Sequence, residues 1–162
     1  MKKDKILLLS AEIDKCFEQL EKLFSYYSQA KEDLQILGSD KSYDLVIMAD
    51  VFADYYTCLE TVFVRISKFF ENNLDRSKWH THLLEKMTLT IPGIRNCLLR
   101  DKTYNALKEL LRFRHFKRYY FEFDYDRDRI EFLEKKFLIS FPLIKEDLNN
   151  YKQFLAKLAE AC

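Results

Sequence analysis

Only two glycines and two prolines occur in this chain of 162 residues. Sandwiches, barrels and doubly wound α/β folds need many tight turns, and such turns depend on Gly, Pro, Asn and Asp at special backbone dihedrals. Two glycines cannot supply those turns, nor can they form a glycine-rich phosphate-binding loop. Hydrophobic residues make up 48% of the chain, which is enough to bury the core of one domain. We therefore predict a single all-α domain spanning residues 1–162.

Apolar residues recur at helical spacing in five stretches of the sequence. Gly38 ends the first stretch, and the Ser39-Asp40 pair after it can cap the next helix. Pro142 lies inside the last stretch, where it should kink the helix or split it in two. The acidic and aromatic stretch 121–126 breaks the periodicity and is predicted to be a turn. An antiparallel bundle of about five helices is predicted, with helices over residues 6–37, 43–70, 77–87, 101–120 and 128–158.

The aromatic content bears on assembly. With 14 Phe and 10 Tyr, the chain has more aromatic side chains than the core of one small bundle needs. Aromatic residues left over from the core would form exposed stripes on the long helices, and exposed apolar patches often become interfaces. The composition therefore predicts a homodimer.

The charge balance excludes a general attraction to polyanions. Lys and Arg number 27 against 26 Asp and Glu, so any affinity for nucleic acid or membrane must come from a local patch. The apolar run at residues 6–9 is shorter than the core of a secretory signal, and no stretch approaches the ~20 apolar residues of a membrane span. We expect a cytoplasmic protein with reduced thiols and no contact with membranes.

Metal-ligating residues are sparse and badly spaced. The four cysteines lie tens of residues apart without a C-x-x-C pair, so no zinc site is predicted and no cofactor is expected. His80 and His82 flank Thr81 and would point to different sides of a helix, which favours surface or capping roles over metal binding. The cysteines are Cys16, Cys58, Cys97 and Cys162.

A basic segment at residues 111–120 is the strongest candidate site. Four cations fall within seven residues, interleaved with aromatic residues and His115 and without any carboxylate: Arg112, Arg114, Lys117 and Arg118. At ~100° per residue, Arg114 and Arg118 project within roughly 20° of Leu107, on the apolar stripe of the helix. Arginines on such a stripe need a partner, which can be a carboxylate, a phosphate or a facing subunit. His115, Arg112 and Tyr119 lie on a neighbouring face.

Two interpretations of this segment stay open from spacing alone. In the first, the segment binds RNA, because guanidinium groups contact phosphates while aromatic rings stack on splayed bases. In the second, the cations form a structural ion-pair network within the fold.

The sequence from residue 79 onwards resembles the HepT-like branch of the HEPN superfamily. The resemblance is carried by the blocks 79–87, 91–95 and 104–107, and is sharpest at 111–126. It implies a small all-α protein of a family that is usually dimeric and includes many metal-independent endoribonuclease toxins. Such toxins are typically encoded beside a minimal nucleotidyltransferase (MNT) antitoxin, so the implied partners are a second copy, an MNT-type antitoxin and RNA.

The active motif of that family is Arg, four residues, His, one residue, Tyr. Its Arg falls on Arg114, its His position on Tyr119 and its Tyr position on Phe121. In the family the His activates the ribose 2′-hydroxyl or protonates the leaving oxygen, while the Arg stabilises the phosphorane charge. A tyrosine, with an ordinary pKa near ~10, is a poor general base at neutral pH. Phe121 has no hydroxyl to accept the AMP that the MNT partner attaches in related pairs.

Three explanations of this departure stay open: catalysis is lost while binding remains, His115 substitutes as the acid or base, or the change is a detoxifying substitution. Two copies of Arg114, His115 and Arg118 could also line one cleft across a dimer. We expect an RNA-directed toxin component with a degenerate motif; the alternative is a non-catalytic module that binds a nucleotidyltransferase-type antitoxin or RNA. The candidate catalytic residues are Arg114, His115 and Tyr119, and the candidate RNA-binding residues are Arg112, Lys117 and Arg118.

Overall fold

The structure of the chain is a computed structural model that describes residues 3–38, 43–71, 79–119 and 124–162. These residues form five helices and no strand, which confirms the predicted all-α fold. The predicted caps at Ser39 and Asp40, and residues 121–123 of the predicted turn at 121–126, lie outside the described residues. The helices are α1 (Lys3–Ile36), α2 (Tyr43–Glu71), α3 (Trp79–Lys86), α4 (Asp101–Tyr119) and α5 (Arg127–Glu160).

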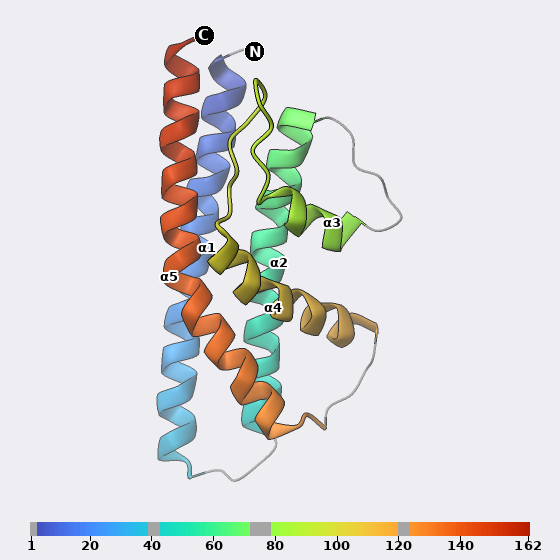
Figure 1. Cartoon of the computed structure of the whole chain (residues 1–162). Helices are drawn as coiled ribbons and strands as arrows, with labels where there is room; N and C mark the ends of the chain where they lie inside the picture. Colours follow the sequence, from blue (N-terminus) through green and yellow to red (C-terminus); the bar gives the residue numbers. More distant parts are fainter. Residues whose placement is uncertain (1–2, 39–42, 72–78, 120–123) are drawn as a thin grey trace.

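Three long helices form the body of the molecule. Figure 1 shows α1 running antiparallel to α2 and α5 along the full length of the fold, while α4 crosses them obliquely. Helix α4 packs on both α2 and α5, and the short helix α3 packs on α2 and α4. The basic segment therefore lies on a helix that has one side on the bundle and the other side free for α3 and solvent.

The ends of the helices follow the turn chemistry of the sequence. Gly38 has a φ of 58°, a left-handed conformation that glycine adopts without strain, and it ends α1 as predicted. Asp126 caps α5 by accepting a hydrogen bond from the backbone N–H of Arg129. Pro142 does not split α5, but Figure 1 shows the helix changing direction near its middle, which confirms the predicted kink.

Aromatic rings fill the junction of α1, α2 and α5. Phe137 is fully buried at its centre, with ring centroids 5.0 Å from Tyr27 and 4.9 Å from Tyr55. The prediction that surplus aromatic residues line the surface is not confirmed, because most described rings lie in or against this core. The exposed aromatic residues among the described side chains are Tyr26, Tyr43, Tyr119 and Phe132. The aromatic content therefore gives no support to the homodimer, which stays a prediction.

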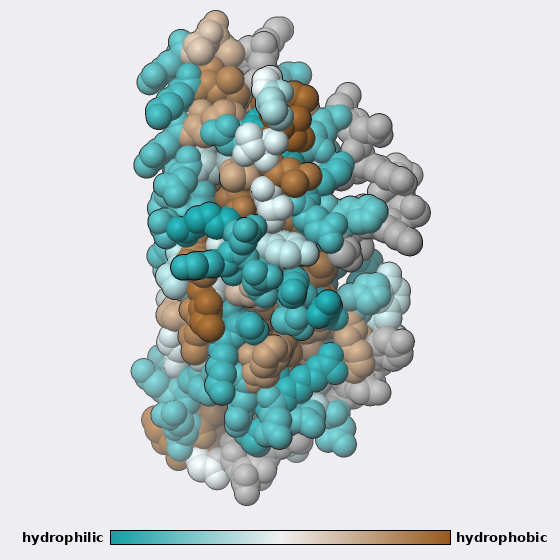
Figure 2. All heavy atoms as spheres, viewed as in Figure 1, coloured by the Kyte–Doolittle hydropathy of each residue, from teal (hydrophilic) through white to brown (hydrophobic). Residues whose placement is uncertain are grey.

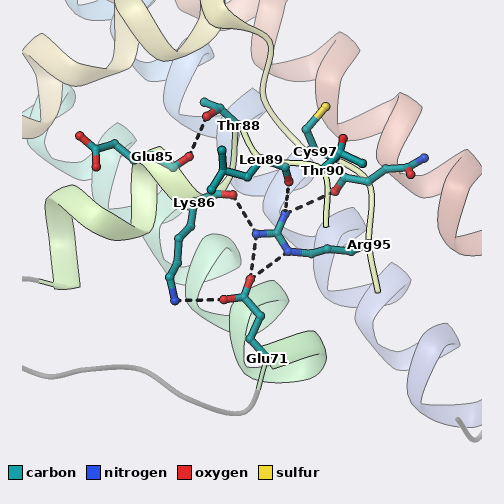
Figure 3. A network of polar contacts seen from close by, with 9 residues as sticks. Glu71, Glu85, Lys86, Thr88, Leu89, Thr90, Arg95 and Cys97 are labelled. Atoms are coloured by element: carbon teal, nitrogen blue, oxygen red, sulfur yellow. Dashed lines mark hydrogen bonds and ion pairs between the residues drawn. The ribbon is translucent and has the colours of Figure 1, made fainter. Parts of the chain in front are cut away.

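A buried arginine joins α2, α3 and the loop that leads to α4 (Figure 3). The guanidinium of Arg95 donates two hydrogen bonds to Glu71 Oε1, at 3.0 and 2.8 Å, and others to the carbonyl oxygens of Lys86 and Leu89. Lys86 Nζ binds the second oxygen of Glu71 at 3.0 Å. Glu71 and the carbonyl oxygens thus compensate the buried guanidinium and fix α3 and the loop after it against the end of α2.

The start of α4 is held by α5. Asp147, 2% exposed, accepts hydrogen bonds from the Thr103 hydroxyl (2.5 Å), from Arg100 Nε (2.5 Å) and from the Arg100 backbone N–H (3.2 Å). These contacts fix both the position and the rotation of α4 on the bundle. No helix in the described part of the chain is both long and apolar enough to cross a membrane.

Candidate nucleic-acid interface

Helix α4 divides the basic segment between two sides of the helix. Arg114 and Lys117 face the acidic side of α2, whereas Arg112, His115 and Tyr119 face outward. The division follows from helix geometry, because residues three or four apart share a face. The two cations that face α2 pair with carboxylates, as the ion-pair interpretation predicts, and RNA binding by the outward side chains stays a prediction.

Arg114 is held in a largely buried ion pair with α2. Its Nη2 lies 2.7 Å from Glu60 Oε2, its Nη1 lies 3.4 Å from Glu60 Oε1, and its Nε lies 3.4 Å from the Thr57 hydroxyl. The side chains of Arg114 and Glu60 are 13% and 6% exposed. The requirement that an arginine on the apolar stripe must have a partner is met here by a carboxylate of the same chain.

Lys117 makes a second link to α2. Its Nζ lies 2.5 Å from Asp50 Oδ1. Partial burial alone would lower the pKa of Lys117, but the hydrogen bond and the charge of Asp50 raise it above its ordinary value. Lys117, predicted as an RNA-binding residue, is thus paired with a carboxylate of the bundle.

The outward side of α4 carries cations and rings at spacings of four, three and four residues: Lys108, Arg112, His115 and Tyr119. The Arg112 side chain is 69% exposed and pairs with Glu109 one turn earlier. The rings of His115 and Tyr119 lie 4.6 Å apart, and Tyr119 is 58% exposed. We call these four residues, together with Arg118, the outer face of α4.

Arg118 differs from its predicted position. It was expected on the apolar stripe with Arg114, but it is exposed, and its guanidinium carbon lies 6.0 Å from the centre of the Tyr119 ring. The reason is its place in the last turn of α4, beyond the part of the helix that the bundle covers. No carboxylate of the described residues pairs with Lys108, His115 or Arg118.

A hollow of about 350 Å³ lies between α3 and α4, next to the outer face. Buried Leu84 and Leu111 provide its apolar floor. Polar and aromatic side chains form the rest of its lining: Glu85, Tyr104, Lys108, Arg112 and His115. Figure 2 shows hydrophilic residues over most of this side of the molecule, with small hydrophobic areas between them.

The structure does not bring all candidate residues to one point. Arg114 is directed to Glu60 while His115 contacts Tyr119, so the two side chains serve different sides of α4 within one chain. Phe121 lies outside the described residues. Glu60, Asp50 and the residues that α3 adds to the hollow were not predicted from the sequence. One feature of the sequence does point to Glu60: it is a carboxylate within an otherwise apolar helical stretch.

Comparison of the sequence with known proteins identifies the family of this chain. Residues 47–155 match the sequence model of a family described as HepT-like protein. No curated protein and no solved structure gives a match. The matched region includes Glu60, the whole of α3 and α4, and most of α5, and it covers more than half of the chain. The chain belongs to the HepT-like family of HEPN-type domains.

Proposed function

We propose that this protein is an RNA-directed HEPN domain, the toxin component of a toxin–antitoxin pair, and that it binds RNA through the outer face of α4. The observation that carries the proposal is the side-by-side arrangement of Lys108, Arg112, His115 and Tyr119, with Arg118 adjacent. The net charge of the whole chain is only +1, so the local excess of positive charge on this face does not simply follow from a basic composition.

The chemistry of the outer face suits a flexible RNA strand. Arginine and lysine contact phosphates, and exposed rings such as those of Tyr119 and His115 offer stacking surfaces for unpaired bases. The adjacent hollow falls in the range of about 300–1,000 Å³ that small-ligand pockets occupy, and it combines an apolar floor with a carboxylate from Glu85. A nucleobase beside the bound backbone therefore has a place to enter.

Cleavage by the usual motif is expected to be weak. Arg114 corresponds to the Arg that stabilises the phosphorane in the family, but its charge is already offset by Glu60 at 2.7 Å. Tyr119 stands where the family has its general acid–base histidine, and a phenol with an ordinary pKa near ~10 does not exchange a proton readily at neutral pH. These two features favour a protein that still binds RNA but cleaves it only weakly.

A second candidate is cleavage in which His115 replaces the missing histidine. The observation in its favour is the contact between His115 and Tyr119, which puts an imidazole one helical turn from the family's histidine position. This candidate predicts that RNA cleavage by the unmodified protein depends on His115.

The binding proposal is tested by fluorescence anisotropy with labelled tRNA at low salt. Replacing Lys108, Arg112 and Arg118 together with alanine should weaken binding at least tenfold. It should also reduce the slope of log affinity against log salt by about 2, since each phosphate contact on a single strand contributes ~0.7.

The matched control removes three exposed lysines from α1 and α5, by replacing Lys22, Lys135 and Lys157 with alanine. This control has the same net charge as the outer-face variant and should bind tRNA nearly as well as the unmodified protein. Equal losses in the two variants would show that binding follows net charge alone and would overturn the proposed interface. For the toxin–antitoxin assignment, we expect an adjacent reading frame that encodes a small nucleotidyltransferase.

A further inference from the structure

Two cysteines that are distant in the sequence meet between α1 and α2. Cys16 Sγ and Cys58 Sγ lie 3.6 Å apart, and both are free thiols. Cys16 is 2% exposed, while Cys58 is half-buried and also hydrogen bonds to Gln19 Oε1 at 3.5 Å. Forming a bond of about 2.05 Å between the two sulfur atoms would need an approach of only about 1.5 Å.

A groove gives small solutes a route to this pair. A hollow of about 390 Å³ runs between α1 and α2, and both cysteines line it, together with polar side chains that include Lys15, Gln19 and Arg65. Structural cysteines are usually sealed in an apolar core, where oxidants do not reach them. This pair instead has one sulfur in the core and the other at the bottom of an open groove.

The two thiols are not equivalent. The hydrogen bond from Cys16 lowers the pKa of Cys58 against the opposing effect of burial. The same hydrogen bond, followed by burial, raises the pKa of Cys16. Because the thiolate is the nucleophile, Cys58 is the sulfur prepared to react first, and Cys16 is the thiol placed to respond.

We propose that Cys58 and Cys16 form a peroxide-oxidation site, in which Cys58 reacts with the peroxide first and Cys16 then closes a disulfide between α1 and α2. In the first step, the Cys58 thiolate attacks one oxygen of hydrogen peroxide, the O–O bond breaks, and a sulfenic acid and hydroxide form. In the second step, the Cys16 sulfur attacks the Cys58 sulfur, and the sulfenic hydroxyl leaves with a proton as water. Two thiols and one peroxide give one disulfide and two waters, so the thiols lose the two electrons that the peroxide gains.

The site lies directly beside the residues that hold α4. Thr57, next to Cys58 on α2, contacts Arg114, and Glu60 lies one turn further along. A disulfide at Cys58 would therefore fix the segment of α2 against which the basic helix packs. This inference does not depend on the proposed RNA binding, since it concerns α1 and α2 alone.

The test treats the folded, fully reduced chain with hydrogen peroxide and maps the products by peptide mass spectrometry. The expected product is an intramolecular Cys16–Cys58 disulfide that dithiothreitol reverses. Its formation should raise the melting temperature by about 5–15 °C, because it constrains the unfolded chain. Oxidation of the exposed Cys97 or Cys162 while Cys16 and Cys58 remain thiols would overturn the proposal.

The order of the two steps is tested in a chain with Cys97→Ser and Cys162→Ser, which retains only the pair. Adding Cys16→Ser should stop the reaction at a sulfenic acid on Cys58, which dimedone traps. Adding Cys58→Ser should leave Cys16 unmodified under the same conditions. Dimedone trapping on Cys16 instead of Cys58 would contradict the assigned roles. If a variant folds poorly, the disulfide mapping of the unmodified chain by mass spectrometry still tests the proposal.

Discussion

At the scale of single residues, the pair of Arg114 and Glu60 explains why α4 keeps a charged side chain on its inner face. Both side chains are largely buried, so removing one leaves the other charge without compensation. We predict that Glu60→Leu lowers the free energy of unfolding by about 3–5 kcal/mol in urea titrations. Adding Arg114→Leu to that variant should recover a large part of the loss.

The matched control is the exposed pair of Arg112 and Glu109, where the Arg112 side chain is 69% exposed. Glu109→Leu should change the free energy of unfolding by less than about 1 kcal/mol, because water screens the pair. Similar losses in the free energy of unfolding for Glu60→Leu and Glu109→Leu would mean that the buried pair of Arg114 and Glu60 stabilises the fold no more than an exposed pair.

Tyr119 carries the prediction on catalysis. Tyr119→His introduces a group with an ordinary pKa near ~6.5 that both accepts and donates a proton at neutral pH. Cleavage of total RNA or tRNA should then rise by ~10²–10⁴ over the unmodified protein, the usual size of general acid–base help. Gel analysis of cleavage products checks this, and Arg114→Ala in the Tyr119→His background should abolish the gain. Robust cleavage by the unmodified protein that His115→Ala alone stops would refute this mapping of the motif.

The site could be predicted from the sequence only in part. Helical spacing separated Arg114 from Arg112, His115 and Tyr119, and the structure confirms that separation. Spacing within one helix does not show which residue of another helix lies opposite. The sequence therefore could not indicate whether the partner of Arg114 is a carboxylate such as Glu60 or a phosphate. The position of Arg118 depended on where the bundle stops covering α4, which is also a tertiary property.

At the scale of elements, Arg95 and Glu71 hold α3 and its loop on α2. Burial alone would raise the pKa of Glu71, but the hydrogen bonds from Arg95 and Lys86 hold it below its ordinary value. A carboxyl group whose pKa is lower in the folded state stabilises the fold above its unfolded pKa of about 4.3, and that stabilisation is lost as pH falls through the folded pKa. We predict that Glu71→Gln costs about 2 kcal/mol or more at pH 7 in urea unfolding, and that its deficit shrinks as the pH falls from about 5 to 3.

The exposed Glu146, whose side chain is 57% exposed, provides the control for this experiment. Glu146→Gln should have little effect on the free energy of unfolding at any of these pH values. A deficit of Glu71→Gln that stays constant down to pH 3 would contradict the assigned ion pair.

The helices themselves were predictable because periodicity and turn residues agree along the chain. The predicted second helix, 43–70, differs from α2 by one residue at its end, and Gly38 marks the end of α1 in both. The loop from 87 to 100 has no such regularity. In this loop, Arg95 holds the chain by its hydrogen bonds to Glu71, which lies 24 residues away in the sequence. The fold brings these two residues together, and no local sequence pattern indicates it.

At the scale of the whole molecule, the homodimer remains to be tested. The buried aromatic cluster removes the compositional argument, and the resemblance to HEPN proteins is what still predicts a dimer. Light scattering coupled to gel filtration at micromolar concentration should give twice the 19.6 kDa of one chain. A mass of one chain across that range would contradict the prediction and would leave each outer face of α4 to act alone.

The central claim, that RNA lies on the outer face of α4 and over the hollow beside α3, is tested most directly by photo-crosslinking. Transfer RNA carrying 4-thiouridine is bound at low salt, irradiated and digested, and the linked peptides are identified by mass spectrometry. We expect crosslinks in residues 82–86 and 104–119, with Tyr104, His115 and Tyr119 as the main acceptors. These crosslinks should be lost in the variant that lacks Lys108, Arg112 and Arg118. Crosslinks confined to α1 and α5, unchanged in that variant, would contradict it.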